Sequence, residues 1–110
     1  MTVKVVALIK SKDAISRDEF LNFWQVEHPA FVWEMPGVVQ YVQSPAIEHR
    51  KGWPYSGMAE LYFDTVADVA TAFRSPAADA LREHEHHFIE DIQWFLASET
   101  PVPQPVPVEK

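Results

Sequence analysis

The sequence predicts an α+β domain in which four antiparallel strands form one sheet and two helices cover one face of it. Three observations lead to this prediction. Apolar spacing gives the element order strand, helix, strand, strand, helix, strand; each predicted helix follows a capping signal; and the first and last strands are apolar on both faces. This order is the split βαβ pattern (βαββαβ) of the ferredoxin-like fold.

Composition limits the classes of function. The chain has 110 residues, enough for one domain over residues 1–100, followed by a proline-rich tail at 101–110. It has 9 basic against 16 acidic residues, a formal charge of −7, so we expect no binding to nucleic acid or to an anionic membrane surface. Cysteine is absent, which excludes disulfides and thiolate catalysis. No apolar run is long enough to span a membrane, and we predict a cytoplasmic protein.

The first strand is predicted at residues 2–10, where TVKVVALIK is rich in β-branched side chains. The first helix should begin at about Arg17, because Ser16 and Glu19 have the spacing of a capping box. The buried stripe of this helix is spaced by three, four and seven residues and consists of Phe20, Phe23, Trp24 and Phe31.

Pro29 interrupts this helix near a candidate functional residue. Because proline lacks an N–H and disfavours α geometry at the residue before it, we expect a kink or an early stop at Pro29 and a free carbonyl at Gln25. On a straight helical wheel Glu27 lies nearer the stripe than His28 does. The proline break makes that register uncertain, so both side chains stay candidates for the inner face.

Two strands are predicted in the middle of the chain, at 38–44 and 58–63. The connection between them, Pro45 to Ser56, is long and contains the cluster Trp53, Pro54, Tyr55. Connections of this length in a compact domain are often functional, and we expect this one to be a mobile lid over a pocket mouth.

The second helical region should begin after Thr65, which has an acid three residues later, and restart at Ser75 and Pro76. It is expected to run to about Phe88, and a last strand is predicted at residues 91–99. The sheet face away from the helices is then left uncovered. Since strands 1 and 4 are apolar on both faces, we predict a homodimer that packs through this face.

Three histidines near the end of the second helix suggest a metal site at first sight. His84 and Glu85 begin an HExxH pattern, but the second ligand position is Phe88. His84 and His87 alone form a weak HxxH pair, and His86 points to the far side of the helix. We therefore predict no metal. His84 lies on the apolar stripe and is either a core histidine or a pocket-lining group.

Several stretches of the chain resemble the EthD family. They are FLNFWQVEHP, with its Trp-x-x-x-His spacing, MPGVVQYVQ, and PYSGMAELYFD followed by a helix that ends in FIED, and together the resemblance covers residues 2–99. It implies a dimeric α/β barrel in which each protomer keeps a pocket between helices and sheet. It also implies activity without a metal or organic cofactor on small cyclic or aromatic compounds, as an isomerase, cyclase, lyase or oxygenase.

The resemblance also implies site residues. His28 corresponds to the family's histidine on the first helix, and Tyr41 to a tyrosine used in lactone-isomerising relatives. Those relatives carry a cysteine where this chain has Leu61 after Glu60, and related cyclases carry a histidine near Ala78. These two particular reactions are therefore not expected here.

Our main hypothesis is a cofactor-free enzyme that moves a proton on an apolar cyclic or aromatic metabolite. The predicted catalytic residues are His28, Tyr41 and Glu60, and the predicted substrate contacts are Phe20, Trp24, Phe31, Tyr55, His84 and Phe88. The alternative is a non-catalytic binding or accessory protein for a hydrophobic metabolite in a degradation pathway. Haem binding through His28, His84 or His87 is a third hypothesis.

Overall fold

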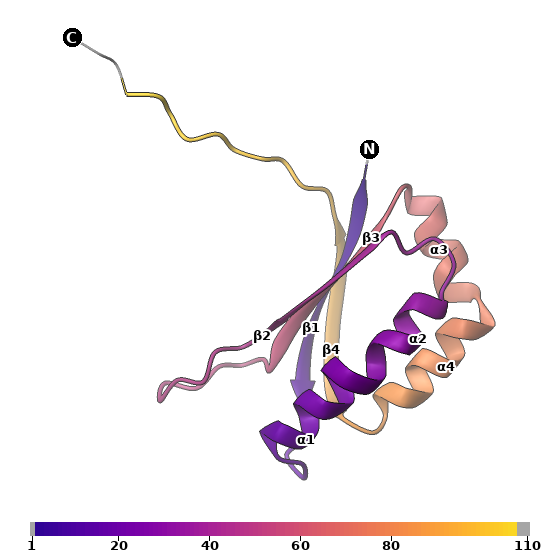
Figure 1. Ribbon diagram of the computed structural model, residues 1–110, viewed down its shortest axis with the longest axis vertical. Coiled ribbons are helices and arrows are strands. Elements are labelled where there is room, and N and C mark those ends of the chain that lie inside the picture. The colour runs from indigo at the N-terminus through magenta and orange to yellow at the C-terminus, as the bar shows by residue number, and fades with distance from the viewer. Residues whose placement is uncertain (1, 108–110) are drawn as a thin grey trace.

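A computed structural model describes residues 2–107 and confirms the predicted element order and fold (Figure 1). The strands are β1 (Val3–Ser11), β2 (Gln40–Pro45), β3 (Gly57–Phe63) and β4 (Ile89–Ala97). They form one antiparallel sheet in the order β2-β3-β1-β4. The helices lie together on one face of this sheet and are α1 (Arg17–Leu21), α2 (His28–Glu34), α3 (Val66–Arg74) and α4 (Pro76–Glu85).

The two faces of the sheet differ because side chains alternate along each strand. In β3 every second residue is buried under the helices, from Gly57 to Phe63. Glu60 lies between them in sequence and therefore points to the opposite, uncovered face. The largest fully buried side chains come from both the helical layer and the sheet and are Trp24, Phe20, Phe63, Phe88, Ile9 and Val32.

The first helical stretch runs from Arg17 to Glu34 and changes its hydrogen-bond pattern in the middle. Asn22–Glu27 is π-helical, and the His28 N–H donates to the carbonyl of Phe23, five residues back. The α pattern resumes at His28, which has φ −66° and ψ −33°. The expected early stop at Pro29 is therefore wrong, because proline falls in the first turn of α2, where its missing N–H is tolerated.

The π-helical segment also resolves which side chain faces inward. A π turn contains more residues than an α turn, so positions after it are rotated back relative to a straight α-helical wheel. His28 is consequently buried and only 4% exposed, whereas Glu27 lies at the surface. The straight wheel favours the opposite arrangement because it assumes one helical period throughout.

The end of the second helical region also differs from prediction. α4 ends at Glu85, three residues before Phe88, and β4 begins at Ile89 instead of residue 91. The N–H groups of His86, His87 and Phe88 each bond a carbonyl three residues back, which tightens the last turn and brings the chain directly into the strand.

The C-terminal segment after β4 has no regular structure over residues 98–107, and Figure 1 shows it leading away from the helices and the sheet. Along residues 2–107, no helix combines the length and apolar character that crossing a membrane requires.

We expect Gly57→Ala to destabilise the protein by about 2 kcal/mol, because extra atoms in a packed core cause strain. An added Cβ at Gly57 would lie 2.7 Å from the Trp24 ring. Chemical denaturation of a double-mutant cycle with Trp24→Phe measures the effect. In the Trp24→Phe background the alanine should cost less than about 1 kcal/mol, and an equal cost in both backgrounds would show that this contact is not the cause.

Candidate functional site

A cavity of about 520 Å³ lies between the helices and the sheet. Its apolar walls come from β1, β3 and β4 on one side and from the helices on the other, and include Val5, Ala7, Ile9, Leu61, Val32, Val69, Phe73 and Leu81. The polar side chains in this lining are Tyr41, His28, Glu85 and Arg82. A cavity of this size and character is typical of a small-molecule site.

Two buried histidines form the centre of the polar group. His28 on α2 and His84 on α4 approach through their Nδ1 atoms at 2.9 Å. They are 4% and 7% exposed, respectively. The Phe31 ring stacks on His84 with ring centroids 4.5 Å apart, and Phe88 meets His28 edge-on at 5.3 Å. The imidazole pair is therefore shielded from water by aromatic rings.

The remaining ring nitrogens of the pair face carboxylates. His84 Nε2 lies 3.2 Å from Glu27 Oε1 at the surface, and His28 Nε2 lies 3.7 Å from Glu85 Oε2. The first distance is a hydrogen bond, whereas the second leaves a gap between two groups that both line the cavity. The four side chains thus form a row from solvent to the cavity.

Burial changes the proton affinity of both cavity groups. The pKa of His28 is lowered from 6.5 to about 4, first by burial and then by the charge of His84. Burial raises the pKa of Glu85 from 4.5 to about 7, although Arg82 acts in the opposite direction. A carboxyl group that titrates near neutral pH is suited to accept or donate a proton there.

The Tyr41 hydroxyl is linked to the π-helical segment through the Gln43 side chain. In a π pattern the residue that would bond the Trp24 carbonyl is Pro29, which has no N–H. The Gln43 side chain takes this place: its Nε2 donates to the Trp24 carbonyl at 2.7 Å and to the Tyr41 hydroxyl oxygen at 2.6 Å. The freed carbonyl therefore belongs to Trp24 and not to Gln25 as expected. Burial raises the pKa of Tyr41 to about 12, so its hydroxyl stays protonated.

The structure brings together only some of the predicted site residues. Trp24, His28 and Tyr41 line the cavity. Most of the other predicted contacts pack in or beside the aromatic core around the histidine pair, namely Phe20, Phe31, His84 and Phe88. Glu60 lies on the other sheet face, paired with Lys4. Sequence reasoning missed Glu85, although its spacing of four from Leu81 and seven from Ala78 put a carboxylate on the inner stripe of the helix.

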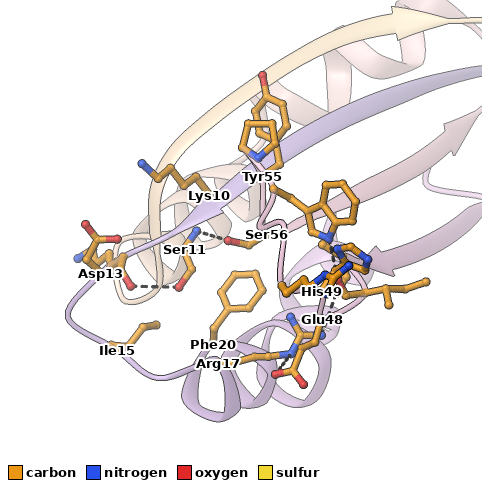
Figure 2. A pocket seen from close by; sticks show the side chains of 16 residues that line it. Lys10, Ser11, Asp13, Ile15, Arg17, Phe20, Glu48, His49, Tyr55 and Ser56 are labelled. Atoms are coloured by element: carbon orange, nitrogen blue, oxygen red, sulfur yellow. Dashed lines mark hydrogen bonds and ion pairs between the residues drawn. The ribbon is translucent and has the colours of Figure 1, made fainter.

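Tyr55 belongs to a second, more open cavity of about 810 Å³ between α1, the end of β1 and the 46–56 loop. Figure 2 shows Phe20 at this cavity, with Arg17 and Glu48 paired at its edge at 3.3 Å. The Tyr55 hydroxyl donates to Gln93 Oε1 at 3.0 Å. The loop predicted as a lid therefore lines this second cavity and not the one that contains His28.

The histidines of the HExxH-like stretch do not converge. His86 and His87 are exposed, and both ring nitrogens of His84 already have partners in His28 and Glu27. Across residues 2–107, no three His, Asp or Glu side chains are placed to hold a metal ion.

Comparisons with known proteins agree with this architecture. The EthD domain model matches residues 12–92. An EthD family protein of Bacillus halodurans superposes with a TM-score of 0.77 at 19% identity, covering 91% of this chain and 100% of the other. A protein of unknown function from Bacteroides fragilis, described as dimeric and ferredoxin-like, gives 0.70 at 15% identity and 89% and 96% coverage.

A third solved structure, the cofactor-independent oxygenase SnoaB of Streptomyces nogalater, gives a TM-score of 0.67 at 14% identity and covers 94% of this chain and 98% of that one. None of the curated protein sequences matches the chain. At these identities the solved structures establish the shared fold.

We expect Glu85→Gln to stabilise the protein more at high pH than at low pH. The folded-state pKa is raised from 4.5 to about 7, so folding disfavours the charged form and the penalty grows as pH rises through this window. The gain in unfolding free energy should be about 3 kcal/mol at pH 8 and about 1 kcal/mol at pH 5.

Urea denaturation at the two pH values measures this difference. Glu83→Gln, an exposed carboxylate on the same helix, is the matched control and should change little at either pH. An equal effect of Glu85→Gln at pH 5 and pH 8 would contradict the assigned shift.

Proposed function

This chain belongs to the EthD family, and on that premise we propose that it binds a small apolar cyclic or aromatic metabolite and transfers a proton on it without a cofactor. The observation that carries the proposal is the pair of a buried His28 and a partly buried Glu85 in an apolar cavity that Tyr41 also lines. The fold shared with a cofactor-independent oxygenase supports the same class of chemistry.

Glu85 and His28 divide the proton transfer between them. With a pKa of about 7, Glu85 is poised near neutral pH to take a proton from an acidic carbon or hydroxyl of the ligand. His28, whose pKa is about 4, stays neutral under these conditions and offers Nε2 as a hydrogen-bond partner in the gap of 3.7 Å. The pair can therefore hold one proton in either of two positions while the ligand reacts.

Tyr41 orients the ligand. Its hydroxyl oxygen accepts from Gln43, which leaves the phenolic proton free to donate into the cavity. A donor at this place stabilises the negative charge that develops on a carbonyl or phenol oxygen as a proton leaves the neighbouring carbon. The ligand class that fits is a cyclic ketone, lactone or phenol. Glu60 is not included in this site, because it faces away from the cavity.

We infer that the active form is a homodimer that packs through the sheet face away from the helices. On that face Phe95 of β4 is 52% exposed and lies opposite Val6 of β1. A large apolar side chain at this position on an edge strand is suited to a second sheet. A relative with this fold is described as dimeric, which supports the inference.

We expect the protein to accelerate deuterium uptake beside the carbonyl of a bicyclic ketone such as 2-tetralone in D2O, followed by NMR. The rate should rise with pH through about 7, as Glu85 loses its proton. His28→Gln and Glu85→Gln should each reduce it by about a hundredfold, which is typical of a lost acid or base.

The control for this experiment is His49→Gln, an exposed histidine outside the His28 cavity, which should keep the wild-type rate. Binding of the ketone without accelerated exchange would overturn the catalytic proposal and favour a non-catalytic binding protein.

We expect Phe95→Glu to convert the dimer to a monomer, because it places a charge in the apolar contact between sheets. Light scattering at micromolar concentration measures the mass. Val26→Glu is the control, since Val26 is 72% exposed on the helical layer and should leave the dimer intact. A monomeric wild-type protein would contradict the inferred dimer.

A further inference from the structure

We propose that Glu27 and His84 form the solvent-side half of a proton relay that holds His28 in the tautomer with a bare Nε2 facing the cavity. The relay of protons rests on the proposed function. The tautomer of His28, in contrast, is present whether or not a substrate is turned over. Neither Glu27 nor His84 lines the cavity, so both act through His28.

The relay begins at the surface. The Glu27 side chain is 45% exposed, and its two oxygens have different partners: Asn22 Nδ2 donates to Oε2 at 3.1 Å, and Oε1 faces His84 Nε2 at 3.2 Å. An ionised carboxylate only accepts hydrogen bonds. The hydrogen between Glu27 and His84 therefore resides on His84 Nε2.

The tautomers of both rings follow from this end point when both rings are neutral. A neutral imidazole carries one hydrogen, so His84 with a protonated Nε2 has a bare Nδ1. This Nδ1 lies 2.9 Å from His28 Nδ1, and one of the two must donate. His28 Nδ1 is therefore protonated, and His28 Nε2 is bare and directed toward Glu85, 3.7 Å away.

The same arrangement can carry a proton outward with balanced bonds. A ligand C–H or O–H bond breaks and a His28 Nε2–H bond forms, directly or by way of Glu85. In the same step, so that His28 stays neutral, the His28 Nδ1–H bond breaks and a His84 Nδ1–H bond forms. The His84 Nε2–H bond then breaks as a Glu27 O–H bond forms. Glu27 releases the proton to water. The rings return to the starting tautomers when a proton passes along the same bonds in reverse, from Glu27 to the ligand, as hydrogen exchange at the ligand carbon requires.

Burial limits direct proton exchange between the two imidazoles and water. Aromatic rings contact both imidazoles, and the pair is almost fully inaccessible. A cavity closed around its ligand excludes the water that would otherwise exchange protons with His28. The row from Glu27 to His28 supplies a route of hydrogen-bonded side chains in its place.

The test uses ¹⁵N-histidine-labelled protein without ligand at pH 8. Long-range ¹H–¹⁵N correlation should identify His28 as the Nδ1–H tautomer and His84 as the Nε2–H tautomer. In Glu27→Ala the acceptor for the His84 Nε2–H group is lost. The populations of the His28 Nδ1–H tautomer and of the His84 Nε2–H tautomer should therefore fall together. Glu34→Ala, an exposed glutamate on the same helical stretch, should leave both tautomers as in wild type.

An Nε2–H tautomer of His28 in the wild-type protein, or unchanged tautomers in Glu27→Ala, would overturn the proposal. Deuterium uptake by 2-tetralone is the second readout, and Glu27→Ala should slow it about tenfold or more because the His28 tautomer with an unprotonated Nε2 is then less populated. Correct tautomers without any exchange activity would refute the proposed function while leaving the tautomer assignment intact.

Discussion

The polar side of the cavity depends on one change of helical register between Asn22 and His28. The π-helical turns bring His28 inward, where it meets His84, and they place Pro29 at the position whose N–H would otherwise bond the Trp24 carbonyl. Gln43 from β2 fills this vacancy and holds Tyr41 with the same amide nitrogen. A single backbone irregularity thus sets two of the three proposed functional groups.

Placing two ionisable side chains, His28 and Glu85, in the cavity costs free energy, and the cost falls on opposite protonation states of the two groups. His28 resists protonation and Glu85 resists ionisation, both because they are buried. Near neutral pH the favourable state is therefore one in which His28 is neutral and Glu85 carries or shares a proton. The same burial that destabilises the charged forms also makes the pair responsive to a ligand that alters its surroundings, and functional sites commonly retain such costs.

Because side chains alternate along each strand, the two faces of the sheet have different surroundings. Its inner face forms one wall of the cavity through Val5, Ala7 and Leu61. Its outer face carries the Lys4–Glu60 ion pair and the exposed Phe95. β4 is an edge strand whose apolar side chains are partly exposed on both faces, with Trp94 on the cavity side at 63%. One strand therefore lines the cavity with one face and carries the surface proposed for a second protomer on the other.

The sequence by itself determined the order of elements, the capped helix starts and the aromatic stripe, because these depend on neighbours within a few residues. The resemblance to a family also singled out His28 and Tyr41, and both line the cavity. Only the tertiary structure decided that His28 pairs with His84, 56 positions away, that Glu85 faces the cavity and that Glu60 does not. These outcomes depend on the π-helical register, on strand alternation and on contacts between distant elements, for which no local pattern carries a signal.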